Sequence, residues 1–522
     1  MNAITTKLLV CDYLVVGAGA ASIAFIDTLL THLPTTTIVL VDKNPIPGGH
    51  WVHAYGYVHL HQPSLLYGVA SRQLEGNWAK LLLRKFTLPW NHRASKNEIL
   101  HHYATYIQDK VDAGKIQYYP NCEYQFSEES TNTVDDNYLH SFSNLDGSMK
   151  YSVQVKKKVV NGILGECIVP STNPVNFHVD DGITILTPNQ IFEEKVTLID
   201  YSKNVKKKHF VVLGCGKTAM DTLVYLQRDM NVQPDQISWI IPNDVWMMLR
   251  SGSGSPWSWP EALLRSRMDE NEAALSLERK GIFARLDTNI VPTKFRFPLV
   301  GKDELQYMRQ VKNCIRRGRV TNITKNSESG RMVVKFGSDQ EPWSPEILST
   351  ELVLVHCTSP GPFNGNENTD VFASDQQLNL NILFPPPIPF SMSILAFLEA
   401  ARINNTLDMA FARKLCPGEN KSDNEVLRTL ITALSFADGN AGNPIKSMLT
   451  LAVILAIGNK DPMVVYNFIK QNRLSIFNIP GSKIGVYETL GLMLEQAKEF
   501  EFTNDTRMMQ LLRQKLQLLE GK

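Results

Sequence analysis

The sequence predicts an α/β protein in which the order strand, glycine turn, helix, strand occurs twice. The first occurrence begins with the apolar, β-branched run 8–16, followed by the letters GAGAAS and the helix-like stretch 23–30. The second begins with FVVLGCG at 210–216, followed by KTAMDTLVYLQ and the strand ISWII. Strands that alternate with helices in this way form parallel sheets with helices on their faces. With 522 residues the chain is too long for one core, so we expect two or three domains.

The first unit has small residues at the three positions that a nucleotide-binding turn requires. Gly17 permits the tight turn, Gly19 lets the backbone approach a pyrophosphate, and Ser22 allows the helix to pack close to the strand. The helix N-terminus offers unpaired N–H groups and a partial positive charge to phosphates. The next strand, 37–41, ends at Asp42, whose carboxylate can accept hydrogen bonds from the hydroxyls of an adenosine ribose. We therefore predict a Rossmann-type dinucleotide site.

The letters KNPIPGGHW follow Asp42, and Gly48 and Gly49 allow the backbone to pass close to a flat ligand. Here the chain resembles the flavin-containing monooxygenase superfamily, in which a GxGxxS site and an acid are followed by GGxW near the flavin. The stretch YGYVHLHQPSLLYGVASRQL at 55–74 resembles a little-characterised branch of NAD(P)/FAD-dependent oxidoreductases in that superfamily. The resemblance implies FAD at this site, held by Gly17, Gly19, Ser22, Asp42, Lys43, Gly49, His50 and Trp51.

The second unit resembles the NAD(P)H site of the same superfamily, whose usual form is GxGxSA. Small residues again take the key positions, and the residues expected to hold this cofactor are Gly214, Gly216, Lys217, Thr218 and Ala219.

The end of the second strand bears on the choice between NADPH and NADH. Ile241, Pro242 and Asn243 stand there, so no acid occupies the ribose position, which favours NADPH and leaves NADH open. The Arg that the family places beyond this site is missing, and only Lys217 or Arg250 could meet a 2′-phosphate.

The remaining segments predict how the domains are divided. Alternating strands at 116–126 and 138–160, with a tight turn at Asp146-Gly147, predict an antiparallel crossover ribbon. The run ELVLVHCTSPG at 351–361 resembles the ATG-like segment that closes the FAD sheet. We thus expect an FAD domain at 1–204, an NAD(P)H domain at 205–345, the closing part of the FAD domain at 346–402, and an amphipathic helical region at 403–522.

The closing part should end in a helix, because PPPIPF at 385–390 leads into MSILAFLEAAR. The resemblance implies that this helix starts beside the flavin pyrimidine, where its dipole would stabilise negative charge on reduced flavin. The alternative is a helix that only closes the core.

Candidate catalytic residues lie at 61–64, the letters HQPS. By resemblance, an amide residue near the flavin oxygen adduct belongs in this neighbourhood. Gln62 could donate to a peroxide oxygen and His61 could shuttle a proton to it. A histidine here can equally be a satisfied structural side chain.

Two other groups of side chains have both a functional and a structural interpretation. Trp246, Trp257 and Trp259 surround the SGSGSP loop and form either a mobile aromatic lid or ordinary core packing. The lysine runs 156–158 and 206–208 are expected to be solvated strand ends.

The chain departs from the family where oxidation of a substrate would be decided. The hallmark FxGxxxH(x)3(Y/F) is absent, and the corresponding region 161–182 reads NGILGECIVPSTNPVNFHVDDG. The leading hypothesis is an oxidoreductase in which NAD(P)H reduces FAD and a C4a-(hydro)peroxyflavin formed with O2 oxygenates a small organic substrate. The alternatives are a flavin oxidase or dehydrogenase, and a non-catalytic redox sensor or scaffold whose helical C-terminus binds a partner.

Bulk charge does not select a partner. Lys and Arg total 53 against 52 Asp and Glu, a net charge of +1, which gives no reason to expect nucleic acid or an anionic membrane. The N-terminus shows no secretory signal and the apolar stretch 448–457 is too short to span a bilayer, so we expect a cytoplasmic protein, compatible with a homodimer. Seven single cysteines without a C-x-x-C pair predict free thiols, no redox dithiol and no metal site.

Overall fold

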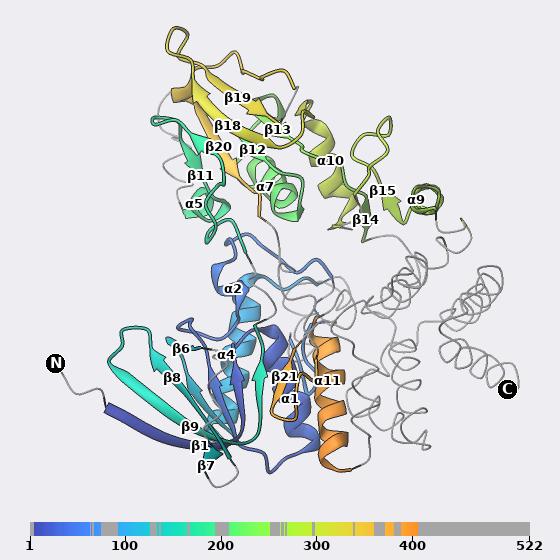
Figure 1. Ribbon diagram of the computed structural model, residues 1–522. Coiled ribbons are helices and arrows are strands. Elements are labelled where there is room, and N and C mark those ends of the chain that lie inside the picture. Colours follow the sequence, from blue (N-terminus) through green and yellow to red (C-terminus); the bar gives the residue numbers. More distant parts are fainter. Residues whose placement is uncertain are drawn as a thin grey trace, which may run out of the picture.

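Two sheet-centred units make up the described part of the computed structural model (Figure 1). The structure describes residues 5–62, 64, 67–74, 92–125, 133–134, 137–163, 168–193, 208–250, 262, 266, 269–294, 298–337, 340–359, 371–380 and 388–405. The helices predicted for the C-terminal region, the tryptophans at 257 and 259 and the 206–207 part of a lysine run lie outside these residues.

The first unit is built on a mixed sheet that has eight strands among the described residues, in the order β5-β2-β1-β9-β8-β6, with β21 paired to β9 and β7 to β8. The strands β5, β2, β1, β9 and β21 run parallel, whereas β6, β7 and β8 are antiparallel to their neighbours. Their bounds are β1 (Thr5–Val16), β2 (Ile38–Val41), β5 (Ile116–Tyr119), β6 (Cys122–Tyr124), β7 (Thr133–Val134), β8 (Asn137–Asn144), β9 (Met149–Asn161) and β21 (Gln377–Asn379).

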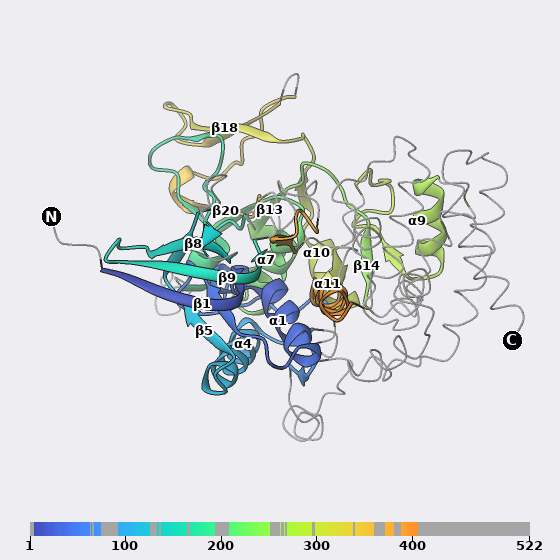
Figure 2. The same cartoon turned by 60° about the horizontal axis from the view of Figure 1, so that its bottom comes forward.

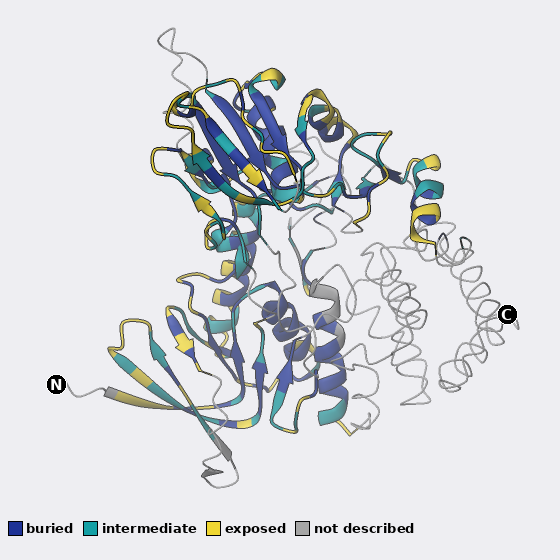
Figure 3. Ribbon diagram, turned by 45° about the horizontal axis from the view of Figure 1, so that its top comes forward, coloured by how far each residue is buried: buried dark blue, intermediate teal, exposed yellow. Residues whose placement is uncertain are grey.

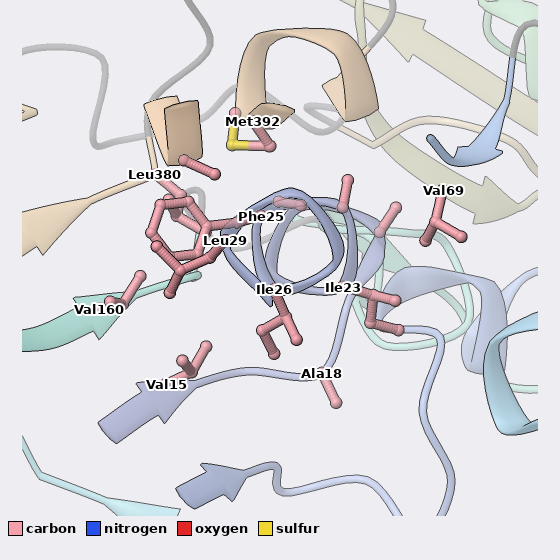
Figure 4. Close-up of a cluster of buried hydrophobic side chains, with 14 of the residues drawn as sticks. Val15, Ala18, Ile23, Phe25, Ile26, Leu29, Val69, Val160, Leu380 and Met392 are labelled. Carbon is pink, nitrogen blue, oxygen red and sulfur yellow. The ribbon is translucent and has the colours of Figure 1, made fainter. Parts of the chain in front are cut away.

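Alternation along β1 gives this sheet two apolar faces. Tyr13 and Val15 face α1 (Ala20–His32), and Figure 4 shows Val15 and Val160 of the sheet beneath Phe25, Ile26 and Leu29 of that helix. Helices α4 (Lys96–Asp112) and α11 (Ile388–Ile403) contribute to the same core. Leu14 and Val16 point to the other face, where they pack with residues of β6, β8 and β9. Figure 2 shows α11 alongside α1.

The second unit is a parallel sheet in the order β11-β20-β12-β13-β17 with helices on one face and a small sheet, β10-β18-β19, on the other. In Figure 3 the strands of this sheet are almost wholly buried. The strand bounds are β10 (His178–Val179), β11 (Ile185–Leu186), β12 (His209–Leu213), β13 (Ile237–Ile240), β17 (Asn313–Ile315), β18 (Val320–Lys325), β19 (Met332–Phe336) and β20 (Leu352–His356). The helices are α5 (Pro188–Glu193), α7 (Lys217–Arg228) and α10 (Lys302–Gln310).

Shorter elements complete the described chain. They are α2 (His50–His53), β3 (Gly68–Val69), β4 (Arg72–Gln73), η2 (Pro234–Gln236), β14 (Met247–Leu249), α9 (Glu270–Arg279), β15 (Phe283–Ala284), β16 (Leu299–Val300) and η3 (Ser349–Glu351). None of the described helices has both the length and the apolar character that crossing a bilayer requires.

The α/β prediction with two Rossmann-like units is confirmed, and so is the hairpin at Asp146-Gly147. There β8 and β9 pair as antiparallel strands, and Gly147 adopts a φ of 70°. The predicted closing helix is also present, as α11, although β5 is a parallel strand of the sheet and not part of the ribbon.

The prediction that 351–361 completes the FAD sheet is wrong. Strand β20 pairs in parallel with β12 and β11, so it is a central strand of the second sheet. Because β11 lies at 185–186, the end of the segment 1–204 that was predicted for the FAD domain also belongs to the second sheet. Among the described residues after β20, the chain next joins the first sheet at β21, which pairs with the end of β9. A buried parallel strand is apolar on both faces, so its composition does not indicate which sheet it joins.

The lysine run 156–158 is only partly solvated. Lys158 is fully buried and donates from Nζ to the backbone oxygens of Ser374 and Asp375, at 3.1 and 2.9 Å. A buried ammonium group requires hydrogen-bond acceptors, and these two oxygens provide them. The bonds also connect β9 to the turn before β21. The prediction of a solvated strand end is therefore wrong for Lys158, whereas Lys156 is exposed.

Candidate functional site

The first glycine turn joins β1 to α1 at the carboxyl edge of the first sheet. Gly17 has a φ of 93°, which a residue with a Cβ adopts only with strain, and its N–H donates to Val41 O at 2.7 Å. Gly19 is the N-cap of α1 and provides no side-chain cap, and the first turn of α1 holds no acidic residue. The N–H groups that begin this helix are therefore left for an external acceptor.

Asp42 follows β2 and lies against the glycine turn. Its carboxylate accepts hydrogen bonds from the backbone N–H of Ala18 and, at 2.6 Å, from that of Asn44. Only 5% of Asp42 is exposed, and this burial raises the pKa of the carboxyl group against the opposing effect of the two N–H donors. An acceptor thus stands beside the turn, at the place where the sequence predicts the ribose.

Ser22 packs against the end of β9, as its small size predicts. It is fully buried, and a Cβ added to Gly162 would lie 1.8 Å from the Ser22 hydroxyl oxygen. Gly162 is itself held by a 2.9 Å hydrogen bond from its N–H to Val16 O. A larger side chain at either position would push α1 away from the sheet.

The stretch 48–51 closes over the first glycine turn. The N–H of Gly48 donates to Ala18 O at 2.8 Å, and a Cβ added to Gly49 would lie 2.9 Å from the Cα of Gly19. The sequence predicts that these glycines permit close approach to a flat ligand. In the structure the close approach is to the turn itself, so a side chain at position 49 would displace the turn.

The residues after Gly49 are packed and neutral. Trp51 belongs to the first core and donates from Nε1 to Tyr67 OH at 2.7 Å. Burial, and then the charge of His53, lower the pKa of His50 to about 4. Lys43 is exposed next to Asp42 and is the one cation among the predicted FAD residues.

The second glycine turn has the same local form. Gly214 has a φ of 113° and donates to Ile240 O at 3.1 Å, and Gly216 is the N-cap of α7 without a side-chain cap. Space is open at the position where a Cβ of Gly216 would stand. Ala219 is fully buried, which lets α7 pack closely on the sheet, and Thr218 is part-exposed at the helix start.

Helices α4, α9 and α10 each begin with an oxygen acceptor of their own. Ser95 and Glu98 form a capping box at the start of α4, Asp269 caps α9, and Glu304 accepts from the N–H of Gly301 at the start of α10. Helices α1 and α7 have no such cap and no acid in the first turn. The two glycine turns therefore fit anionic groups such as the pyrophosphates of FAD and NAD(P)H.

Lys217 and Arg250, the cations predicted for a 2′-phosphate, are instead bound to acidic side chains. Lys217 pairs with Asp221 one turn along α7, and its Nζ lies 3.7 Å from Glu304 Oε2. Arg250 pairs with Glu304 and donates to Leu299 O at 2.9 Å. Their charges are thus engaged at the junction of α7 and α10.

Glu304 is the centre of this charged cluster. It is 6% exposed and also accepts from Arg93 Nη1 of the first unit, at 3.1 Å. Burial alone would raise its pKa, but Lys217, Arg250, the N–H of Gly301 and Arg93 together lower it to about 2. Nothing in the local sequence marks Glu304 as a site residue, so the sequence prediction missed it.

His61 lies beside this cluster. The loop that carries it is held at both ends, because Leu60 N donates to Ala94 O at 2.9 Å and Ser64 N donates to His92 O at 2.9 Å. Burial, and then the charge of Lys217, lower the pKa of His61 to about 4. His61 is therefore neutral at neutral pH and faces charges of the second unit. Its neighbour Gln62 is partly buried in the same loop.

Two tyrosines of the first unit contact α7 directly. Tyr55 OH donates to Asp221 Oδ2 at 2.8 Å, and Tyr57 OH shares a 2.8 Å hydrogen bond with Thr222. Tyr57 packs against the cores of both units. Neither tyrosine was among the predicted site residues, and both lie at a turn in which Val58 N donates to Tyr55 O at 3.2 Å.

Trp246 belongs to the core, as the structural interpretation predicts. It is fully buried, its ring is tilted by 38° from that of Phe283 with 6.3 Å between the ring centroids, and the Arg285 guanidinium lies 5.7 Å from its ring centroid. A lid role for the tryptophans at 257 and 259 concerns residues outside the described chain. The five described cysteines are free, and four of them are buried.

Curated relatives match much of the chain. Uncharacterized proteins of Mycobacterium tuberculosis and Mycobacterium bovis are 31% identical to it over 366 residues, which is 68% of this chain and 61% of each relative. The chain thus spans less than two thirds of the length of these relatives. No protein-family model matches the sequence.

Solved structures similar to this chain include monooxygenases. A polycyclic ketone monooxygenase from the fungus Thermothelomyces thermophila has a TM-score of 0.48 and 11% identity, over 78% of this chain and 77% of that one. Cyclohexanone monooxygenase from Rhodococcus sp. Phi1, bound to NADP+, has a TM-score of 0.45 and 14% identity, over 77% and 85%. The cadaverine monooxygenase DfoA of Erwinia amylovora, bound to FAD, has a TM-score of 0.45 and 13% identity, over 75% and 95%.

Proposed function

We propose that this chain binds FAD at its first glycine turn and NADPH at its second, and acts as an oxidoreductase of the flavin-monooxygenase kind. One observation supports the proposal most. In each of the two sheets a parallel strand ends in a positive-φ glycine turn, at Gly17 and Gly214, followed by a helix whose first N–H groups have no side-chain acceptor. Two such turns in one chain are the arrangement that two dinucleotides require.

The residues of the first turn divide the binding of FAD between them. The N–H groups at the start of α1 would bind the pyrophosphate, and the Asp42 carboxylate, which accepts from Ala18 and Asn44, has further acceptor sites for the ribose hydroxyls. The side chains that pack near Gly49, namely His50 and Trp51, exclude water from this end of the sheet. When bound, FAD supplies the redox chemistry, taking a hydride from NADPH and passing electrons to O2.

The finer proposal is oxygen transfer to a small organic substrate. It rests on the GxGxxS, acid and GGxW pattern of the first 51 residues. In this proposal Gln62 donates its amide N–H to a reacting oxygen, which is a role that a neutral side chain can fill without a change of charge. His61, which is neutral at pH 7, acts beside it as a hydrogen-bond partner and not as a cationic acid.

The test is reduction of the reconstituted flavoprotein. The full chain is incubated with FAD, freed of excess cofactor, and mixed with NADPH without oxygen while the visible flavin absorbance is followed. Bleaching is expected, and Asp42→Ala should lower retained FAD at least roughly tenfold. Asp181→Ala, at an exposed position, is the matched control. A chain that takes up no FAD, or FAD that NADPH does not reduce, would overturn the proposal.

The reaction with oxygen then separates a monooxygenase from an oxidase. Oxygen is added to the reduced protein with a panel of ketones, amines and sulfides, and peroxide is measured against NADPH consumed. A substrate that suppresses peroxide and gains an oxygen atom supports oxygen transfer. Peroxide equal to NADPH with every compound would mean an oxidase, and would reject the finer proposal.

A further inference from the structure

Three adjacent strands of the second sheet end side by side. Strands β12, β13 and β17 are neighbours in the sheet, and hydrogen bonds continue between them past their last residues. Gly214 N donates to Ile240 O at 3.1 Å, and Ile241 N donates to Ile315 O at 2.9 Å. Arg316, the residue after β17, therefore comes to the same edge as the second glycine turn.

Arg316 forms a two-point ion pair at this edge. Its Nε lies 2.9 Å from Asp244 Oδ2 and its Nη2 lies 3.3 Å from Asp244 Oδ1. The side chain of Asp244 is 11% exposed and that of Arg316 is 26% exposed. Asp244 lies in the loop after β13 and Arg316 follows β17, so the ion pair joins the ends of these two strands.

The pair also lies within electrostatic range of Cys215, the middle residue of the glycine turn. Burial raises the pKa of the Cys215 thiol to about 12, the charge of Asp244 raises it further, and the charge of Arg316 opposes this. Both charges therefore act on the turn that would carry a pyrophosphate.

An adenosine ribose belongs at this place in a Rossmann unit, beyond the end of the second strand. An acid there accepts from the ribose hydroxyls, whereas an arginine accommodates a 2′-phosphate. Here both are present, but the carboxylate is held by the guanidinium at two points. A guanidinium has five N–H donors, so the pairing leaves others to bind a phosphate.

We propose that Arg316 and Asp244 select NADPH over NADH, with Arg316 receiving the 2′-phosphate and Asp244 holding the guanidinium in place. This inference rests on the proposed function, because it requires a nicotinamide dinucleotide at the second glycine turn. Lys217 and Arg250 lie at the junction of α7 and α10, where Asp221 and Glu304 engage them, whereas Arg316 follows β17 at the edge where the ribose belongs. With Arg316 removed, the unpaired Asp244 carboxylate repels a phosphate.

The experiment measures binding of adenosine fragments to the FAD-loaded full chain by calorimetry. The probes are 2′,5′-ADP, which carries the 2′-phosphate, and 5′-AMP, which does not. The wild-type protein should prefer 2′,5′-ADP, and Arg316→Ala should weaken its binding roughly 10- to 100-fold while leaving 5′-AMP unchanged. Arg316→Lys, which keeps the charge without the planar fork, should lie between the two.

Arg317→Ala is the matched control. Arg317 is the next residue, and it donates to the backbone oxygens of Glu341 and Pro342, both at 2.8 Å. Its removal should leave both affinities unchanged. Unchanged binding of 5′-AMP by Arg316→Ala shows that this variant is folded. If the unpaired Asp244 carboxylate unfolds the single variant, the double variant Arg316→Ala with Asp244→Ala removes that carboxylate and takes its place in the experiment.

The outcomes separate this inference from the proposed function. A wild-type protein that binds neither fragment contradicts the NADPH site as a whole. A wild-type protein that prefers 2′,5′-ADP, together with an Arg316→Ala variant that keeps the preference, overturns the role of Arg316 alone. Equal binding of the two fragments by the wild-type protein also overturns this inference, without contradicting a nucleotide site.

Discussion

The ring of Tyr57 lies flat on the ring of Tyr225, with 4.0 Å between the ring centroids and 5° between the ring planes. Tyr57 follows the glycine-rich stretch of the first unit, and Tyr225 belongs to α7, the helix that starts at the second glycine turn. The Tyr57 hydroxyl also bonds to Thr222 on the same helix at 2.8 Å. One side chain thus connects the first unit to the helix that would carry the second nucleotide.

Tyr57→Ala should weaken this connection between the two units. It removes an aromatic pair, worth about 0.5–1.5 kcal/mol beyond its buried area, together with the packing of the ring against both cores. We expect a fall of roughly 2–4 kcal/mol in the free energy of unfolding, measured in urea. Tyr57→Phe keeps the stacked ring and loses only the bond to Thr222, so it should cost about 1 kcal/mol. Equal losses in both variants would show that the stacking contributes nothing.

Substitution of the two positive-φ glycines should remove one nucleotide each. Gly17→Ala should lower the FAD content, and Gly214→Ala should lower the affinity for NADP+, because φ values of 93° and 113° strain any residue with a Cβ. At position 214 the added Cβ would also lie 3.1 Å from Cys357 O. Each loss is checked by equilibrium binding of the corresponding nucleotide.

Gly147→Ala provides the control for these glycine variants. Gly147 has a φ of 70° in the hairpin between β8 and β9, and a Cβ there would meet nothing within 4 Å. It should cost about 1 kcal/mol of stability, because of strain alone, and leave both nucleotides bound. If Gly147→Ala lost FAD as completely as Gly17→Ala, general instability would explain both results.

Both glycine turns could be predicted because each is a local pattern. The order of strand, turn and helix depends on residues within a few positions of one another, and Gly17, Gly214 and Asp42 lie where that order places them. The helix α11 was predicted for the same reason, from prolines that precede an apolar run.

Residues that meet through the fold could not be predicted in this way. Glu304 lies 87 positions after Lys217 in the sequence, and Arg93 comes from the other unit, yet all three share one cluster. Arg316 was not predicted because the sequence analysis considered the residues at the end of β13, whereas Arg316 follows β17. Strand β20 was assigned to the wrong sheet because pairing partners of a buried parallel strand are chosen in three dimensions.

Glu304→Gln should destabilise the protein strongly above pH 4.5 and progressively less as the pH falls from 4.5 toward 2. The substitution leaves Lys217, Arg250 and Arg93 without their shared carboxylate, which costs about 3–5 kcal/mol for a buried group. The pKa of Glu304 falls from 4.5 to about 2 in the folded chain, so its contribution is fully present above pH 4.5. It is lost as the pH falls toward 2, since the unfolded chain then binds the proton first.

This pH dependence is checked by urea unfolding of both proteins at several pH values between about 3 and 7. The difference between wild type and Glu304→Gln should shrink as the pH is lowered. Glu328→Gln, at an exposed position in a surface turn, should show no such difference at any pH. A constant difference across the range would contradict a carboxylate that ionises near pH 2.

His61→Gln should leave the pH profile of flavin reduction unchanged between about pH 5.5 and 8. A pKa lowered from 6.5 to about 4, first by burial and then by Lys217, keeps the His61 imidazole neutral throughout this interval. The same shift should appear in stability. Below pH 6.5 the His61 side chain binds a proton in the unfolded chain but stays unprotonated in the folded chain, so the free energy of unfolding falls as the pH drops from 6.5 toward 4. His61→Gln should remove this part of the pH dependence of stability. His178→Gln, on an exposed side chain paired with Asp180, is the matched control. A kinetic limb near pH 6.5 that vanishes only in His61→Gln would show that His61 gives or takes a proton during the reaction, as the proton-shuttle hypothesis requires.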